Sequence, residues 1–452
     1  MTIDTELIKN IDLRACPRLD ICKGLKVYGD VEGDLLNITH SGVSFASKSH
    51  KLPSIFLIKM KLMGKEFSAK AKTVWSFAEG GVNRYGAAFL DQNNLSWSLI
   101  TRFLILREFS SVTRLAGRKD RMAVGKFAKR LIKYIGILED VDTRFSLNGT
   151  DQTECLDVFS KATDSIMLSG EELRCELLDP KLYRKIKEDF RKIMAPWAYK
   201  SRIVKHGHDK PKGYPGDFKT LEVIYDHLLI SSNNIGLLFD AYLQGSPYGV
   251  AVRNRKNILK QHLKRFIFNN NGPLRILNLA SGSCREIREL FQENQISDRD
   301  LNFFLLDWDN ESLQFSRAKL LELQTNSKFN FLNEDLLAII RNDNFSNKYR
   351  NSFDFIYSIG LADYLPDRVI KKLVRQCYDW LSAGGEFVIA HKDREKTFSH
   401  LSPEWFCDWE FIPRNEAEVI KLLKESGVSE AITEISRDST KDIFFITIKK
   451  NK

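Results

Sequence analysis

The sequence predicts a multidomain fold with an N-terminal antiparallel β-barrel, a helical middle or cap segment, and a C-terminal Rossmann-like α/β domain. The chain has 452 residues, which is too long for one ordinary hydrophobic core. Short alternating segments fill its first part, and helix-spaced apolar residues fill the middle. In the last part, apolar strands alternate with helical patterns, which indicates βαβ units. We place the domains at residues 1–110, 111–225 and 226–452, with lead-in helices at the start of the third.

The N-terminal domain is predicted from segments in which apolar and polar residues alternate, separated by Gly, Asn, Ser and Asp. This pattern indicates a small antiparallel all-β domain. The segments are Gly24–Tyr28, Gly42–Ala46, Ile55–Lys61, Glu66–Trp75 and Tyr85–Leu90.

The middle segment carries two groups of apolar residues at helical spacing. A polar, glycine-containing stretch, Ser146–Thr153, is a predicted loop. The apolar groups are Phe103, Leu104, Leu106 and Phe109, followed by Phe127, Leu131, Ile132 and Tyr134.

The C-terminal domain is predicted from short apolar strands separated by helical patterns. One such pattern runs from Val369 to Leu381 and is closed by Gly384 and Gly385. The final segment, ITEISRDSTKDIFFITIKK, indicates two strands joined by a polar turn. We therefore expect a parallel sheet that ends in an antiparallel hairpin. The predicted strands are Ile276–Leu279, Phe303–Leu306, Phe329–Leu332, Phe353–Tyr357 and Glu386–Ala390.

Composition narrows the class of protein. Hydrophobic residues make up 43% and charged residues 28% of the chain, as in soluble globular proteins. We find no apolar run long enough to span a bilayer and no apolar core of a signal peptide at the N-terminus. Seven cysteines without a C-x-x-C pair argue against a disulfide scaffold and against a zinc site, so we expect no metal. These features favour a cytoplasmic location.

The formal net charge of +10 allows three kinds of partner: nucleic acid, an anionic membrane surface or a small anionic ligand. Lys and Arg are spread along the chain rather than gathered in a tail. A generally basic surface is therefore the simplest interpretation, and the charge alone selects no partner.

The segment RILNLASGSCREI predicts a strand, a tight turn and the start of a helix. In a doubly wound sheet this first turn lies under the ligand crevice, and small residues let the backbone approach the ligand. The segment resembles the first motif of the class I methyltransferases, acid-x-Gly-x-Gly-x-Gly. Only the middle glycine, Gly282, is kept, because Asn278, Ala280 and Cys284 stand at the acid and outer glycine positions.

Three further strand ends match this family in order. Asp307 ends a strand, where a carboxylate can accept both hydrogen bonds from a ribose diol, although either it or Asp309 could instead cap the next helix. In the family, the position of Asp335 contacts the adenine amino group, and the position of Leu336 packs on the ring. FDFIYSIGLADYLP follows, where the family places the reacting methyl group. The resemblance implies S-adenosylmethionine as cofactor, with contacts from Ala280, Ser281, Gly282, Asp307, Trp308, Asp335, Leu336 and Ser358.

Other segments resemble a narrower family, the methyltransferases typified by enzymes that make 3-hydroxy-fatty-acid methyl ester signals. They are KPKGYPGDF, SPYGVAVRNRKNIL, LADYLP and DWEFIPRNEAEV, within Trp197 to the C-terminus. The resemblance implies methyl transfer to the carboxylate of a small-molecule or fatty-acid-like acceptor. Such an acceptor is already ionised at neutral pH, so it needs alignment and exclusion of water more than a strong base.

Candidate residues for this chemistry lie in the same segments. Arg253 or Arg255 could hold the acceptor's carboxylate or that of the cofactor; a basic surface helix is the alternative. Tyr364 and His391 follow the fourth and fifth strands, and His391 could act as a base toward a hydroxyl or amine acceptor. We expect the segment with Tyr214 and Asp217 to close over the cofactor, unless it is a structural turn.

The N-terminal domain carries a second motif. LRACPR and NITHSG are followed by a strand, a loop and a Tyr-Gly-x-x-Phe strand, an order that resembles the PilZ domains, small β-barrels that bind cyclic di-GMP. By this resemblance, two arginines clamp phosphates and stack on guanines, while side-chain oxygens bond a guanine edge and a glycine permits the turn. Two residues depart from the usual Asp and Ser of the motif but keep a hydrogen-bonding oxygen. The matching residues are Arg14, Arg18, Asn37, Thr39 and Gly42.

These observations together predict a methyltransferase regulated by cyclic di-GMP. Two rivals stay open. A signalling adaptor could keep a degenerate methyltransferase fold, since the acid and outer glycines of the first motif are replaced. A nucleic-acid methyltransferase would suit the basic charge, but an N-P-P-Y or D-P-P-Y motif and a nucleic-acid module are missing. The sequence identifies neither the acceptor, the sign of the regulation nor the oligomeric state.

Overall fold

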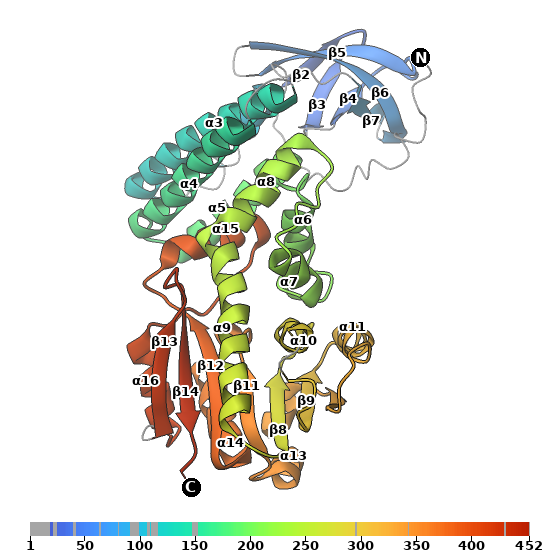
Figure 1. Cartoon of the computed structure of the whole chain (residues 1–452). Coiled ribbons are helices and arrows are strands. Elements are labelled where there is room, and N and C mark those ends of the chain that lie inside the picture. The colour runs from blue at the N-terminus through green and yellow to red at the C-terminus, as the bar shows by residue number, and fades with distance from the viewer. Residues whose placement is uncertain are drawn as a thin grey trace. The chain divides into compact units, whose positions relative to one another are not determined.

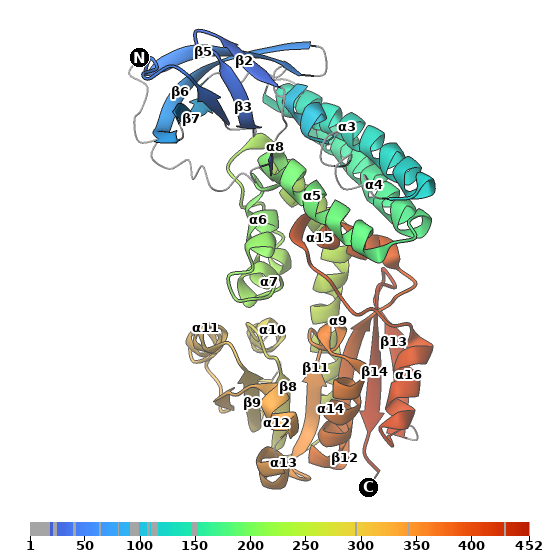
Figure 2. The ribbon, with the colours of Figure 1, turned by 180° about the vertical axis from the view of Figure 1, so that it is seen from behind.

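The computed structural model describes residues 19–20, 25–38, 42–62, 65–79, 81–90, 99–105, 109, 116–146, 152–293, 296–341, 343–428 and 431–451. The chain divides into two compact units, and we describe each by itself. One comprises residues 1–204 and 231–239, and the other comprises 205–230 and 240–452. Figures 1 and 2 show the ribbon from two opposite sides.

The N-terminal unit contains an antiparallel β-barrel, as predicted. Its strands follow the order β3-β2-β5-β6-β7-β4, and pairing of β3 with β4 closes the barrel. Buried aromatic and aliphatic side chains such as Phe45, Phe56 and Ile58 fill the interior. The strands are β1 (Leu19–Asp20), β2 (Lys26–Gly29), β3 (Gly33–Ile38), β4 (Gly42–Ser47), β5 (Ile55–Leu62), β6 (Lys65–Glu79) and β7 (Val82–Phe89).

Strand β3 was not among the predicted strands. Its sequence, GDLLNI, begins with Gly and Asp and contains Asn, all of which are depleted in strands. It is nevertheless extended because it pairs with β2 on one side and β4 on the other, and because Leu35 and Ile38 point into the core.

Long helices follow the barrel, as the apolar spacing predicts. Tyr134 of α3 and Thr163 of α4 form a buried hydrogen bond of 3.0 Å between their hydroxyls, which fixes the pairing of the two helices. Asp179 caps α5, and Pro180 occupies its first turn, where a missing N–H costs nothing. Residues 147–151 of the predicted loop lie outside the described residues. The helices are α3 (Arg118–Ser146), α4 (Gln152–Glu176) and α5 (Pro180–Ala198).

The C-terminal unit is built on a mixed sheet with the strand order β10-β9-β8-β11-β12-β14-β13. Strands β8 to β12 are parallel, and β14 runs antiparallel to both β12 and β13. This is the Rossmann-like methyltransferase fold expected from the sequence, with the expected terminal hairpin. The strands are β8 (Leu274–Leu279), β9 (Leu301–Asp307), β10 (Lys328–Asn333), β11 (Phe353–Ser358), β12 (Leu381–Lys392), β13 (Ile432–Arg437) and β14 (Ile443–Lys449).

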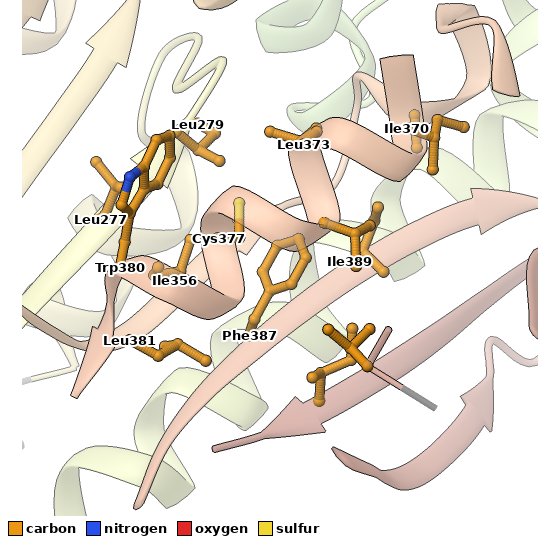
Figure 3. Packing of buried hydrophobic residues seen from close by; sticks show 14 of the residues in the cluster. Leu277, Leu279, Ile356, Ile370, Leu373, Cys377, Trp380, Leu381, Phe387 and Ile389 are labelled. Atoms are coloured by element: carbon orange, nitrogen blue, oxygen red, sulfur yellow. The ribbon is translucent and has the colours of Figure 1, made fainter. Parts of the chain in front are cut away.

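Helices cover both faces of this sheet. On one face, Leu373, Cys377 and Trp380 of α14 pack against Leu277 and Phe387 of the strands, as Figure 3 shows. Helices α12 and α16 complete this face, and α9, α10 and α11 cover the other. These helices are α9 (Pro247–Asn269), α10 (Arg285–Gln292), α11 (Asn310–Leu320), α12 (Leu336–Arg341), α14 (Asp367–Trp380) and α16 (Glu416–Glu425).

The junction between α14 and β12 differs from the prediction. The helical pattern was expected to run through Leu381 to a glycine pair, but β12 already begins at Leu381. The pairing of β12 with β11 shifts register across this segment, and Gly384 adopts a φ of +79°. The glycines therefore form an irregularity inside a strand, which is the other common use of glycine.

Shorter helices connect these parts. They are α6 (Arg202–Asp209), α7 (Phe218–Tyr225), α8 (Asn234–Gly245), α13 (Asp343–Tyr349), α15 (Thr397–Cys407) and the 3₁₀ turn η1 (Ala362–Tyr364). Within the described part of the chain, every helix is too short or too polar to cross a bilayer.

Candidate functional site

The turn after β8 keeps the backbone of a glycine motif without its glycines. Ala280, Gly282 and Cys284 have φ angles of +55°, +53° and +50°, the left-handed region that favours glycine. These are the three glycine positions of the first methyltransferase motif. A non-glycine residue in this conformation costs about 1–2 kcal/mol. The surroundings must therefore hold Ala280 and Cys284 in place.

Hydrogen bonds from neighbouring elements hold this turn. The backbone N–H of Ser281 donates to the carbonyl of Leu306 at 3.0 Å, and the Ser316 hydroxyl donates to the carbonyl of Gly282 at 2.8 Å. A Cβ placed on Gly282 would meet no atom within 4 Å. The turn is therefore held by neighbouring elements and leaves open space at Gly282, as a turn that binds a ligand requires.

Asp307 lies beside this turn, at the end of β9. One carboxylate oxygen accepts from the N–H of Gly282 and the other from the N–H of Asp309, both at 2.9 Å. Burial raises the pKa of Asp307, and these backbone donors oppose the shift. Each oxygen keeps a further lone pair that can accept a hydrogen bond from a ligand. The next residue, Trp308, leaves 58% of its surface exposed.

Of the two acids considered for capping α11, Asp309 is the cap. Its carboxylate accepts from the N–H of Glu311 at 3.0 Å. The same oxygen lies 3.1 Å from the Lys212 ammonium, and the Tyr214 ring lies 5.8 Å from that of Trp308. The segment before α7 thus reaches the end of β9, where Tyr214 was predicted to lie.

Asp217 is buried and caps α7. One oxygen accepts from the N–H of Thr220 at 3.0 Å, and the other is 2.7 Å from Nε2 of His206. Both oxygens are used within the cap segment. Within the fold, Asp217 therefore has a structural role, which was the alternative interpretation of this motif.

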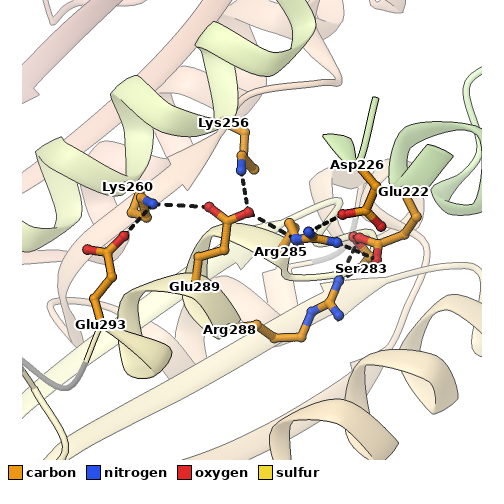
Figure 4. Close-up of polar contacts among 9 residues, drawn as sticks. All are labelled: Glu222, Asp226, Lys256, Lys260, Ser283, Arg285, Arg288, Glu289 and Glu293. Atoms are coloured by element: carbon orange, nitrogen blue, oxygen red, sulfur yellow. Dashed lines mark hydrogen bonds and ion pairs between the residues drawn. The ribbon is translucent and has the colours of Figure 1, made fainter. Parts of the chain in front are cut away.

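Ion pairs link α7 to α10, as Figure 4 shows. Helix α10 follows the turn formed by residues 280–284, which we call the cradle. Glu222 of α7 accepts from the Ser283 hydroxyl at 2.6 Å, from Arg285 at 3.1 Å and from Arg288 at 2.6 Å. This carboxylate therefore holds both the cradle, through Ser283, and the first turns of α10. The network continues through Asp226, Glu289, Lys256, Lys260 and Glu293.

The remaining cofactor candidates lie at the ends of neighbouring strands. Asp335 is exposed after β10, and one of its oxygens accepts from the N–H of Leu337 at 2.8 Å. Leu336 is buried in the core between α12 and the sheet. Ser358 donates to the carbonyl of Leu279 at 3.2 Å and so joins the ends of β11 and β8.

Sequence reasoning missed an acid at this site. Asn278 replaces the acid of the first motif, and its amide donates to Glu286 of α10 at 3.1 Å. The Tyr357 hydroxyl donates to the same oxygen at 2.7 Å. Burial raises the pKa of Glu286. An acidic side chain thus lies beside the motif, but helix α10 supplies it instead of strand β8. Because Glu286 comes eight residues after Asn278, the position where the motif has its acid, the sequence motif did not reveal it.

The structure separates the two candidate arginines of α9. Arg253 donates to the side chain and backbone of Gln244 at 3.0 and 2.7 Å, so its guanidinium is used in joining α8 to α9. Arg255 is buried beside Tyr225. Its guanidinium lies 3.5 Å from where a Cβ on Gly360 would stand, and its Nε has no hydrogen-bond partner. Among the described residues, no carboxylate lies within 4.0 Å of it.

Tyr364 follows β11, whereas His391, which was expected after the fifth strand, lies inside β12 because that strand extends to Lys392. The Tyr364 hydroxyl accepts from the indole of Trp409 at 2.6 Å. His391 is buried, with Nδ1 2.8 Å from the carbonyl of Lys392 and Nε2 3.0 Å from Arg414. Since arginine only donates, Nε2 must accept and Nδ1 must donate. Both nitrogens are therefore engaged within the fold and neither is presented to an acceptor.

Sequence reasoning also missed Lys392, Asp363 and Phe411, which lie beside His391 and Tyr364. Lys392 has a buried ammonium over the Phe411 ring. Asp363 accepts from the N–H of Lys392 at 2.8 Å. In the sequence, Lys392 is only a charged residue directly after His391, at the end of an apolar strand. That position was the one available sign that it belongs to the site.

The barrel candidates are described in part. Arg14, Arg18 and Thr39 lie outside the described residues. The side-chain oxygen of Asn37 is buried and has no partner among the described residues. A Cβ on Gly42 would stand 2.3 Å from the carbonyl of Ala87, so glycine is required there for the approach of β4 to β7, rather than for a turn.

No known family matches the chain by sequence, and no curated protein does so either. Solved structures with some likeness include a protein of Bordetella parapertussis described as a possible exported protein, at 15% identity over 72% of this chain and 97% of that chain, TM-score 0.42. The S-adenosylmethionine-dependent methyltransferase SibL shows 11% identity over 72% and 97% of the two chains, TM-score 0.37. Magnesium protoporphyrin IX methyltransferase of Synechocystis PCC 6803, with bound S-adenosylmethionine, shows 10% identity over 45% and 84%, TM-score 0.33. The strand order described above defines the fold.

Proposed function

We propose that this protein is an S-adenosylmethionine-dependent methyltransferase. The observation that carries the proposal is the cradle at the carboxyl ends of β8 and β9. It combines a left-handed turn with open space at Gly282, a buried Asp307 carboxylate and an exposed indole at Trp308. A doubly wound sheet binds nucleotide-like ligands at this edge. Retention of the glycine-type backbone at Ala280 and Cys284 also argues against a merely degenerate fold.

The residues present fit such a cofactor. We assign the backbone of Ala280, Ser281 and Gly282 to its amino-acid part, and the Ser281 hydroxyl, which is buried without a partner, would gain one. Asp307 would accept from the ribose hydroxyls. The adenine would lie on Trp308, close to Asp335, while Leu336 supports that wall from the core and Ser358 fixes the strand ends behind it.

Tyr214 and Asp217 would act together in closing the site. Tyr214 faces Trp308, and Asp217 holds the segment that carries it. The Tyr214 hydroxyl is protonated at neutral pH, and burial raises its pKa further. The ring could therefore cover the cofactor without placing a charge against it.

For the acceptor we propose a carboxylate of a small-molecule or fatty-acid-like compound. The cofactor supplies a methyl group on a sulfonium sulfur, so transfer forms an O–CH₃ bond, breaks the S–CH₃ bond and leaves a neutral ester and a neutral thioether. Arg255 is buried and lacks a carboxylate partner, and it would hold the acceptor's second oxygen. We assign Arg253 and His391 to positioning and Tyr364 to the wall of the acceptor site.

A second proposal concerns regulation. We propose that the barrel is a PilZ-like domain that binds cyclic di-GMP through Arg14, Arg18, Asn37, Thr39 and Gly42. The observation that favours it is the side-chain oxygen of Asn37, which is buried and has no partner among the described residues, since folded proteins leave few such atoms without a ligand or water. A cytoplasmic location would follow from such a role.

The decisive experiment is calorimetry of the full chain with S-adenosylhomocysteine, the product form of the cofactor. We expect one site per chain, lost when Asp307 is changed to Ala. Incubation with labelled methyl donor and a cell extract, followed by separation of lipids, small molecules and macromolecules, would then identify the acceptor class. An absence of binding would favour the adaptor, and label in DNA or RNA would favour a nucleic-acid methyltransferase.

A further inference from the structure

Lys392, the last residue of β12, is buried in an aromatic enclosure. Only 2% of its surface is exposed. Its ammonium lies 3.2 Å from the centre of the Phe411 ring and 4.1 Å from that of Tyr248. The nitrogen has no hydrogen-bond partner among the described residues. A buried lysine without an acceptor is costly, so its persistence calls for a functional reason.

The charged groups that face this ammonium do not neutralise it. Asp363 from η1 and Asp442 from the turn before β14 favour its charged form, whereas Arg255 from α9 disfavours it. His400 from α15 and the hydroxyl of Tyr248 complete the surroundings. No carboxylate among the described residues lies within 4.0 Å of Lys392. Burial, the largest effect, lowers the pKa of Lys392 well below its ordinary value.

Several unpartnered polar atoms gather around Lys392. They are Arg255 Nε, Lys392 Nζ, His400 Nδ1 and Asp442 Oδ2, all buried and without hydrogen bonds among the described residues. Such a concentration is unusual in a folded protein and indicates a missing partner. Arg255 Nε donates, as does Lys392 Nζ once it is charged, so these two atoms call for a partner with acceptor oxygens, whereas Asp442 Oδ2, an acceptor when ionised, does not.

Next to these donors lies an apolar wall. Phe411 packs against Tyr248, Tyr364 and Trp409, with ring centres 5.6–6.1 Å apart. Gly216 contacts the Trp409 ring so closely that a Cβ there would stand 2.4 Å from it. The segment that carries Tyr214 therefore borders the same wall, and an acceptor here would find donors at one end and rings along its length.

We infer that Lys392 and Arg255 form a two-point clamp for the carboxylate of the methyl acceptor, with the acceptor's apolar part on the rings of Tyr364, Trp409 and Phe411. This inference rests on the proposed function and deepens it by naming the anion-binding end of its acceptor site. Arg255 supplies directional donors and Lys392 a point charge. Because an anion beside Lys392 favours its charged form, the acceptor binds together with a proton.

The experiment uses the full chain saturated with S-adenosylhomocysteine. Octanoate and 1-octanol, which differ only in the head group, are titrated by calorimetry at about pH 8 in two buffers of different ionisation enthalpy. We expect octanoate to bind at least about tenfold more tightly than octanol and to take up a fraction of a proton up to about one. Lys392→Met removes the amino group while keeping the side chain's bulk, and a swap that conserves volume in an apolar enclosure is well tolerated by the fold.

In Lys392→Met, we expect the proton uptake to vanish and octanoate to bind at least about tenfold more weakly, with octanol binding unchanged. The matched control is Lys372→Met on the exposed side of α14. This change should leave the octanoate affinity, the octanol affinity and the proton uptake as in the wild type. Equal binding of octanoate and octanol, or uptake that persists in Lys392→Met, would overturn the clamp. If S-adenosylhomocysteine binds but octanoate does not, the clamp fails and the proposed function survives. If octanoate binds as expected to the chain alone but S-adenosylhomocysteine does not bind, these residues still form a carboxylate-binding clamp, whereas the proposed methyl transfer fails.

Discussion

At the scale of single residues, the cradle is defined by backbone conformation more than by residue type. Cys284 is buried, and its sulfur lies 3.6 Å from the carbonyl of Ser281. The fold thus stabilises a left-handed conformation that the sequence itself disfavours. Local strain of this kind persists where surrounding contacts determine the backbone, and it often marks a ligand site. The turn therefore keeps the backbone conformation of the motif although two of its glycines are replaced.

Two glycines that share a positive φ and open space around them allow the backbone cost of a side chain to be separated from its contact with a ligand. Gly282 and Gly272 have φ angles of +53° and +88°, and a Cβ on either would meet nothing within 4 Å. We predict that Gly282→Ala and Gly272→Ala each lower the free energy of unfolding by about 1 kcal/mol, measured in urea. Only Gly282→Ala should also weaken S-adenosylhomocysteine, by at least about tenfold, because its methyl group enters the cradle. If both variants bound S-adenosylhomocysteine with equal affinity, the cofactor would not bind at Gly282.

His400 makes stability depend on pH. Burial lowers its pKa from 6.5 to about 4. Between these values the unfolded chain binds a proton that the folded chain does not, so acidification favours unfolding. We predict that the free energy of unfolding falls by up to about 3 kcal/mol as the pH is lowered from 6.5 toward 4. In His400→Phe this part of the slope should disappear, while the slope due to carboxylates at lower pH stays. A parallel profile in the variant would contradict the prediction.

At the scale of elements, the positions of the parallel strands were accessible from sequence because each is a short apolar run between helical patterns. Strand β3 and the start of β12 were not, since their residues have little strand preference and tertiary pairing decides their conformation. The same distinction applies to the site. Asp307 and Gly282 follow from strand ends. Nothing local, however, distinguishes Arg253, which binds Gln244, from Arg255, whose Nε has no partner among the described residues, or shows that Lys392 is buried.

Helix α7 is the element whose attachment matters most to the cradle. Glu222 is largely buried and receives donors from Ser283, Arg285 and Arg288. We predict that Glu222→Gln lowers the free energy of unfolding by about 1–3 kcal/mol, because two guanidinium groups lose a charged acceptor. S-adenosylhomocysteine should bind several-fold more weakly, since Ser283 belongs to the cradle. Both are measured by urea unfolding and calorimetry.

The control for this change is Glu425→Gln, which breaks an exposed ion pair between α16 and Lys371. Exposed pairs contribute little, so we expect stability within about 0.5 kcal/mol of the wild type and unchanged cofactor affinity. A cofactor affinity in Glu222→Gln that equals the control would mean that the ion pairs stabilise the fold without shaping the cradle.

At the scale of the whole molecule, the chain passes between its two units at three places, and two of these lie within helices. Val204 and Lys205 are consecutive in α6, and Phe239 and Asp240 are consecutive in α8, yet each pair is divided between the units. A ligand-induced change in one unit would therefore act on a continuous helix of the other. Such a connection makes coupling between a barrel ligand and the cradle physically reasonable, although coupling also requires different affinities in two states.

We predict that saturating cyclic di-GMP changes the dissociation constant of S-adenosylhomocysteine by about 5-fold or more in the full chain, measured by calorimetry. Linkage then requires S-adenosylhomocysteine to change the affinity for cyclic di-GMP by the same factor, which provides an internal check. Asn37→Ala should weaken cyclic di-GMP by about tenfold and leave cofactor affinity without cyclic di-GMP unchanged, because Asn37 lies in the other unit. If cyclic di-GMP binds but neither affinity moves, the barrel is a binding module without equilibrium control over the cradle. If the two factors differ, a further ligand or a change of assembly must enter the cycle, because two sites on one chain cannot be coupled unequally.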